Sequence, residues 1–229
     1  MNSLKMVVTN IGNYGLINLS IMIIYELLYS LKKKYRKQIF YDESITNKYY
    51  EIKNNSGIRK ASKLSYNAPY SPTPIYFLKL ILLKLSLNKK NLNTYFFIDF
   101  GCGAGRTLTF FQENFKKKLG IDFNKRYQKF IPKKMFLNMN LRKISNIKKI
   151  LKKTNSTKYV LYFYEPFDEN LIKKIIEIFI KKKIYIVIVN VKEIKIKNLR
   201  NIYNKTFKNK SKNIKIVCDI LYGNKTFME

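Results

Sequence analysis

Short apolar runs alternate with segments of helical periodicity along the second half of the chain. The apolar runs, bounded by turn residues, predict buried strands, and the segments between them predict helices. The predicted strands are Tyr95–Asp99, Lys118–Asp122, Met135–Asn138, Lys158–Tyr164 and Ile184–Val189. The predicted helices are Arg106–Phe115, Ile144–Lys152 and Glu169–Lys181. This alternation predicts an α/β, doubly wound, mostly parallel sheet with helices on both faces.

The C-terminal segment departs from this alternation. Ile214–Leu221 and Lys225–Met228 flank the turn residues Gly223 and Asn224, a pattern that predicts a closing hairpin. We therefore expect a Rossmann-like sheet of about seven strands with one antiparallel hairpin strand at its side.

The first apolar stretch, residues 15–31, is marginally short for a membrane span and is interrupted by Asn18, Ser20 and Glu26. It carries no cleavage site of the secretory kind and is followed by three lysines. One interpretation is an amphipathic helix that lies on the domain. The other is an interfacial helix, with residues 15–34 at a membrane surface and the lysines against lipid headgroups.

A second apolar stretch precedes the alternating region. Ile75–Leu85 predicts a helix, with Thr73 as its N-cap and Pro74 in its first turn. We expect residues 1–65 to form a helical extension with a basic loop, and residues 66–229 to form the α/β domain.

The amino-acid composition excludes several kinds of catalytic and metal site. The 229 residues are 46% hydrophobic and 15% aromatic, enough to bury a core. The two cysteines form no spaced framework, so a disulfide scaffold or zinc site is not predicted and a reducing, cytoplasmic compartment is expected. The chain contains no histidine, which excludes Ser-His and Cys-His catalysis, histidine metal ligands and a histidine general base.

The formal net charge of +32 would ordinarily indicate an anionic partner, RNA or a membrane surface. Lysine, asparagine, isoleucine and tyrosine are abundant throughout, however, while glycine and proline number only eight and five. That pattern is typical of an A- and T-rich codon bias, so we discount most of the charge.

The segment Asp99-Phe-Gly-Cys-Gly-Ala-Gly-Arg106 joins a predicted strand to a predicted helix. Its three glycines, Gly101, Gly103 and Gly105, allow a sharp turn and the close approach of a ligand, and the helix N-terminus offers free N–H groups. A purely structural strand-to-helix turn is the alternative. The spacing is G-x-G-x-G rather than the dinucleotide G-x-G-x-x-G.

Two carboxylates indicate which kind of nucleotide cofactor the glycine turn could bind. Asp99 precedes the glycines, where it would repel a pyrophosphate and suit an ammonium or sulfonium group. Asp122 ends the second predicted strand, where a carboxylate can accept both ribose hydroxyls of an adenosine. Asp99 therefore favours S-adenosylmethionine over NAD, whereas Asp122 supports nucleoside binding without choosing between the two cofactors.

These residues carry a resemblance. The run from Phe97 to Leu108, followed by Leu119–Asp122, resembles the first two motifs of class I S-adenosylmethionine-dependent methyltransferases. Tyr162–Asp168 is similar to the Asn-Pro-Phe-type fourth-strand end of a bacterial branch whose substrate is unknown. That branch is also similar over Tyr14–Ile17 and Tyr70–Pro74, although Asn13 stands where the family has a histidine and Glu165 where it has an asparagine.

The resemblance implies a cofactor site around the glycine turn. The residues it assigns to the cofactor are Tyr70, Thr73, Asp99, Gly101, Cys102, Gly103, Gly105, Arg106 and Asp122. Asn138 and Asn140 are candidates for adenine contacts. Glu165 and Asp168 are candidate catalytic bases, and Tyr70 and Tyr164 are weaker ones, while the alternative for Glu165 and Asp168 is capping of the following helix.

Three functions remain open from the sequence. The first is methyl transfer by in-line displacement to a protein side chain, a small molecule or RNA. The second is a basic RNA- or membrane-binding module on a non-catalytic cofactor domain. The third is an NAD-dependent oxidoreductase, which the glycine spacing and Asp99 disfavour.

Overall fold

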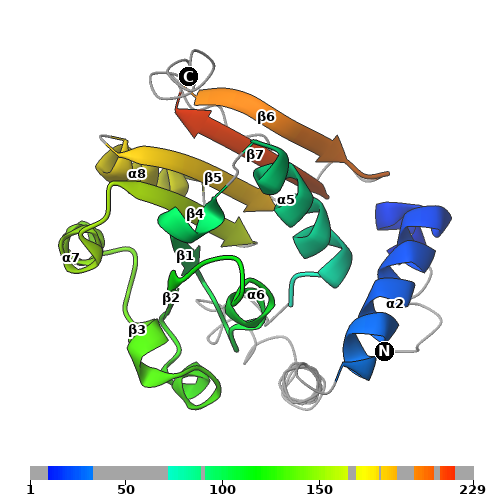
Figure 1. Cartoon of the computed structure of the whole chain (residues 1–229), viewed down its shortest axis with the longest axis horizontal. Coiled ribbons are helices and arrows are strands. Elements are labelled where there is room, and N and C mark those ends of the chain that lie inside the picture. The colour runs from blue at the N-terminus through cyan, green and yellow to red at the C-terminus, as the bar shows by residue number, and fades with distance from the viewer. Residues whose placement is uncertain are drawn as a thin grey trace, which may run out of the picture.

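A computed structural model of the chain describes residues 10–32, 72–88, 91–164, 169–180, 182–189, 199–208 and 212–219. Within these ranges it forms one seven-stranded sheet with the order β3-β2-β1-β4-β5-β7-β6. The first five strands are parallel, and β7 is antiparallel to both β5 and β6. The predicted fold class, a Rossmann-like α/β sheet with an antiparallel hairpin strand, is confirmed (Figure 1).

The bounds of β1 to β5 agree with the predicted ones to within one residue. The strands are β1 (Phe96–Phe100), β2 (Lys117–Asp122), β3 (Phe136–Asn138), β4 (Lys158–Tyr164), β5 (Lys183–Val189), β6 (Leu199–Thr206) and β7 (Asn213–Asp219). The helices are α2 (Leu16–Leu31), α5 (Ile75–Asn88), α6 (Arg106–Phe110), α7 (Ile144–Thr154) and α8 (Glu169–Phe179). Short 3-10 turns cover Leu92–Thr94, Lys125–Phe130 and Lys133–Met135.

Successive strand residues point into two different cores, because side chains alternate across a sheet. In β4, Val160 and Tyr162 enter the layer between the sheet and α5, whereas Leu161 and Phe163 enter the layer between the sheet and α7 and α8. Both faces of the central strands are therefore buried, which explains why their sequences are almost continuously apolar.

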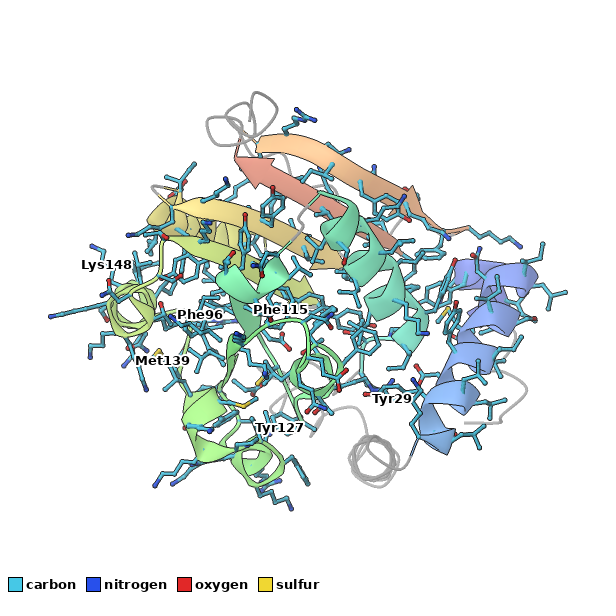
Figure 2. All side chains as sticks on the ribbon, in the orientation of Figure 1. Tyr29, Phe96, Phe115, Tyr127, Met139 and Lys148 are labelled. Atoms are coloured by element: carbon cyan, nitrogen blue, oxygen red, sulfur yellow. The ribbon has the colours of Figure 1, made fainter. Side chains whose placement is uncertain are left out.

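Helix α2 packs against α5 on the outside of the first layer (Figure 1). Its buried residues Met22 and Tyr29 belong to the same core as the sheet residues of that layer. Figure 2 shows Tyr29 on the side of α2 that faces the rest of the domain. The predicted boundary between an extension and the α/β domain, at residues 65 and 66, lies outside the described residues and stays a prediction.

Two local predictions differ from the described structure. The antiparallel hairpin is formed by β7 and the preceding strand β6, whereas the predicted second arm, Lys225–Met228, lies outside the described residues. The sequence of β6 carries little hydrophobic signal because this edge strand pairs on one side only and is largely exposed. Helix α6 ends at Phe110 rather than Phe115, because the chain turns there and buries Phe111 and Phe115 in the core.

The N-cap of α5 is also different from the prediction. The carbonyl of Pro74 accepts from Phe77 and Leu78, so Pro74 precedes the helix rather than standing in its first turn. The hydroxyl of Thr73 is hydrogen-bonded to the hydroxyl of Tyr162 at 2.7 Å, and the backbone N–H of Ile75 donates to Glu26 at 2.9 Å. A carboxylate from another helix therefore satisfies the N-terminus of α5.

Candidate functional site

A pocket lies at the carboxyl ends of β1 and β4. These neighbouring strands are where the chain reverses direction across the sheet, since β2 and β3 lie to one side of β1 and β5 lies beyond β4. In open α/β sheets, ligands bind in the crevice at this switch point. The pocket is lined by Pro72, Thr73, Asp99, Gly101, Cys102, Arg106, Thr107, Tyr162 and Tyr164.

The glycine turn has the backbone conformation that its sequence predicts. Gly101, Gly103 and Gly105 have φ angles of 82°, 50° and 84°, in the region that side-chain-bearing residues rarely adopt. A Cβ on Gly105 would also lie 2.7 Å from Ile131. The backbone N–H groups of Gly101 and Cys102 donate to the carbonyl of Ile121, at 2.8 and 3.1 Å, which ties the turn to β2.

Asp122 holds the same turn from the end of β2. One carboxylate oxygen accepts from the N–H of Gly103 at 3.0 Å, and the other accepts from the N–H of Asn124 at 2.8 Å. Each oxygen has a second lone pair. The carboxylate is half-buried, and burial raises its pKa while its backbone hydrogen bonds lower it. Asp122 is thus positioned to accept hydroxyl groups of a ligand beside the turn.

Asp99 is a buried carboxyl group on the wall of the pocket. Its side chain accepts a hydrogen bond from the hydroxyl of Thr107, the second residue of α6. Burial raises the pKa of Asp99 to about 7, with a smaller increase from the charge of Asp122 and a decrease from the Thr107 hydroxyl. A cationic group in the pocket would favour the ionised form of Asp99.

The guanidinium of Arg106 is paired with a carboxylate of another helix. Its Nη1 lies 2.9 Å from both carboxylate oxygens of Glu26 in α2, and 3.4 Å from the carbonyl of Thr73. Because Glu26 also accepts from Ile75, this one carboxylate joins α2, α5 and α6 beside the pocket. Arg106 therefore has a positioning role in the structure, in addition to lining the pocket.

Cys102 fills the space beneath the turn. Burial raises the pKa of its thiol, with further increases from the charges of Asp99 and Asp122, so the thiol stays protonated. A Cβ on Gly120 would lie 2.7 Å from its Sγ, which explains the glycine in the middle of β2. The described structure gives the Cys102 side chain a packing role beside the pocket that the residue lines.

The structure brings together every predicted cofactor residue that it describes. Thr73, Asp99, Gly101, Cys102 and Arg106 line the pocket. Gly103 is bonded to Asp122, and Gly105 ends the turn. Tyr70, Glu165 and Asp168 lie outside the described residues, so their predicted roles stay predictions.

The two predicted adenine contacts have local partners. The side-chain amide of Asn138 donates to the carbonyls of Asp122 and Phe123, at 3.1 and 2.7 Å. The side-chain oxygen of Asn140 accepts from the N–H of Arg142 at 2.9 Å. Asn138 thus fixes the backbone that follows Asp122.

Four residues at the site escaped the sequence analysis, namely Glu26, Thr107, Phe123 and Tyr162. Glu26 did leave a signal, because a carboxylate inside an apolar helix needs a partner. Phe123 is an aromatic residue with 58% exposure directly after Asp122. Thr107 and Tyr162 gave no signal, since an apolar strand and an amphipathic helix accommodate such residues in their cores.

No protein-family model matches this chain, and no curated protein matches its sequence. Several solved methyltransferase structures are similar to parts of it. An rRNA methylase from Streptococcus thermophilus is 8% identical, with 60% of this chain and 93% of that chain covered and a TM-score of 0.42. A putative methyltransferase from Streptococcus mutans in complex with SAH is 10% identical, with 61% and 96% covered and a TM-score of 0.44. A SAM-dependent methyltransferase from Anabaena variabilis is 10% identical, with 61% and 83% covered and a TM-score of 0.45.

Proposed function

We propose that this chain binds S-adenosylmethionine and transfers its methyl group to an acceptor by in-line displacement. The observation that carries the proposal is the position of two carboxylates around one glycine turn. Asp99 lies in the pocket before the turn, and Asp122 is bonded to the turn's central glycine. A ligand that follows the turn would present a cation to Asp99 and hydroxyl groups to Asp122.

The methionine end of the cofactor fits the pocket by charge. It carries two cationic groups, an ammonium and a sulfonium, against one carboxylate, so its net charge is positive. The pocket wall contains a buried carboxyl group whose pKa is raised to about 7. The nearby guanidinium of Arg106 is paired with Glu26, so a cationic ligand in the pocket could pair with Asp99. A pyrophosphate at the same place would meet Asp99 as a like charge, which argues against NAD.

The adenosine end fits the neighbouring strand. The carboxylate of Asp122 can accept ribose hydroxyls beside the backbone N–H groups that already donate to it. The ring of Phe123 comes next, is exposed, and offers a face on which a nucleobase can stack. The side-chain amide of Asn138 donates to the carbonyl of Phe123, and this hydrogen bond fixes the backbone that carries the ring.

The chemistry requires alignment more than proton transfer. When bound, the cofactor supplies an electrophilic methyl group on a sulfonium, so the chain has to hold the acceptor in line with it. Tyr162 lines the pocket as a neutral side chain, because burial raises the pKa of its phenol. Its hydrogen bond with Thr73 fixes its position. Tyr164 lies at the same edge.

An acceptor that arrives protonated needs a base. Glu165 and Asp168 follow the end of β4 in the sequence, where such sheets bring acceptor and cofactor together, and we propose them for this role. Membership of the bacterial branch with an Asn-Pro-Phe-type strand end depends on the same segment and is part of the proposal.

The acceptor class is tested with labelled cofactor. The chain is incubated with methyl-labelled S-adenosylmethionine and a lysate of its source cell, which is then fractionated into protein, RNA, lipid and small metabolites. We expect label in one fraction, lost with an Asp122→Asn variant and kept with Glu177→Gln, which removes an exposed carboxylate from α8. Cofactor binding without label in any fraction would favour the non-catalytic module.

A further inference from the structure

The outer face of α2 is apolar and exposed. Seven aliphatic side chains on this helix are between 52% and 77% exposed, namely Leu16, Ile17, Ile23, Ile24, Leu27, Leu28 and Leu31. The opposite face of the helix buries Met22 and Tyr29 in the domain core. The seven side chains are thus not the face that holds α2 to the domain.

The seven side chains form one continuous stripe. At 100° per residue they lie within about 140° of the helix circumference. Ser20 is the polar residue inside this arc, and its hydroxyl donates to the carbonyl of Leu16 rather than standing free. Soluble monomers rarely expose contiguous apolar patches of this kind, and such patches mark interaction sites.

Charge indicates which surface would cover the stripe. The one charged residue of α2, Glu26, is turned inward to Arg106, so no carboxylate of the helix faces outward with the stripe. Lys32 is exposed at the end of the helix, and the ammonium of Lys79 lies 4.9 Å from the ring of Tyr25 at its flank. Cations and a tyrosine therefore border an apolar stripe, the arrangement of a helix at a lipid interface.

Lysines occur throughout the chain, and Lys32 and Lys79 lie beside this stripe. A second copy of the chain is a poor occupant, because each copy would bring a formal charge of +32. An anionic bilayer offers both an apolar interior and negative headgroups.

We propose that α2 lies in the surface of an anionic phospholipid bilayer, with this stripe in the acyl region. The helix has 16 residues and none of the described helices is long and apolar enough to cross a membrane, so α2 would lie along the surface. Glu26 on its inner face contacts Arg106 and the N-terminus of α5, and Arg106 lines the pocket. The helix that binds lipid is then also the helix that borders the pocket.

The proposal is tested by co-sedimentation of the full chain with vesicles. One set contains phosphatidylcholine alone, and the other contains phosphatidylcholine mixed with phosphatidylglycerol. We expect binding to the anionic set, and at least about tenfold weaker binding by an Ile24→Gln/Leu27→Gln/Leu31→Gln variant, which loses apolar area and no charge. A Leu27→Gln variant gives a milder form of the same change, and a thermal melt checks that both are folded.

The control is a Lys148→Gln/Lys149→Gln/Lys152→Gln variant, which removes three charges from α7. Figure 2 shows Lys148 projecting outward from that helix, away from α2. We expect its vesicle binding to stay within about twofold of the wild type. An equal loss in this control would show diffuse charge attraction and overturn the proposal.

Three other results would also overturn it. The first is no binding of the wild type to anionic vesicles. The second is vesicle binding that is the same in the wild type and the glutamine variants, together with equal binding of RNA by the wild type and the variants. The third is that light scattering shows the wild type to be a dimer and the triple glutamine variant to be a monomer, and that added vesicles do not dissociate the wild-type dimer.

Discussion

Nη1 of Arg106 lies 2.9 Å from both carboxylate oxygens of Glu26, two residues that are eighty positions apart in the sequence. Arg106 begins the helix after the glycine turn, and Glu26 lies on the inner face of α2. The pair connects an N-terminal helix to the cofactor pocket and is mostly buried on the arginine side, at 8% exposure against 35% for the glutamate.

This pair predicts a measurable effect on stability. A Glu26→Gln variant leaves the guanidinium partly buried without its counter-charge, while its amide oxygen can still accept from Ile75. We expect the free energy of unfolding, from urea denaturation, to decrease by about 1–2 kcal/mol, because one partner remains partly exposed to solvent.

A matched control removes a carboxylate from a surface pair. Glu169 and Lys173 lie 2.8 Å apart in α8, one helical turn from each other, and neither side chain is buried, with exposures of 43% and 36%. A Glu169→Gln variant is expected to change the free energy of unfolding by less than about 0.5 kcal/mol. Equal effects from the two substitutions would mean that the Arg106–Glu26 pair is an ordinary surface contact.

The buried carboxyl group of Asp99 predicts that cofactor affinity depends on pH. With a pKa of about 7, Asp99 is mostly protonated at pH 6 and mostly ionised at pH 8. If a cationic ligand binds the ionised form, its affinity increases about tenfold over that range. Calorimetric titration with S-adenosylmethionine at each pH measures this, and an Asp99→Asn variant should remove the pH dependence.

The same group predicts the opposite trend for the unliganded chain. Its pKa is higher in the folded state than the value of 3.8 it has without burial, so folding takes up a proton between those values. The unfolding free energy contributed by Asp99 therefore decreases as pH rises from about 4 to about 7. An Asp99→Asn variant should melt at a higher temperature than the wild type at pH 8, and a lower melting temperature would contradict this account.

The exposed ring of Phe123 predicts a contribution from base stacking. A Phe123→Ala variant should bind S-adenosylhomocysteine about tenfold more weakly, since stacking a base on an aromatic ring contributes about 1–3 kcal/mol. Truncating another exposed apolar residue, Leu83→Ala on α5, should leave the affinity unchanged. Unchanged affinity in the Phe123→Ala variant would place the adenine elsewhere.

The sequence predicted most of the sheet because its central strands are buried on both faces. Such strands are short apolar runs between turn residues, as in β4 and β5, and their alternation with helices predicts a doubly wound, mostly parallel sheet. The edge strand β6 was missed because it is not buried on both faces. It is paired on one side, mixes polar and apolar residues, and looks like a loop.

The site was predictable where it depends on local geometry. Glycines with positive φ and a carboxylate at each strand end leave a pattern in a few consecutive residues. Contacts between distant segments leave no such pattern, so Thr73, whose hydroxyl is hydrogen-bonded to that of Tyr162, was predicted to be a helix cap. Glu26 was visible as an interruption of an apolar helix, but its partner could be found only in three dimensions.

The most direct test of the central claim is a calorimetric titration of the wild-type chain with S-adenosylmethionine, S-adenosylhomocysteine and NAD. We predict saturable binding of the first two at a single site and no binding of NAD, because Asp99 favours a cation and disfavours a pyrophosphate. Tight binding of NAD with no response to the other two would contradict the account.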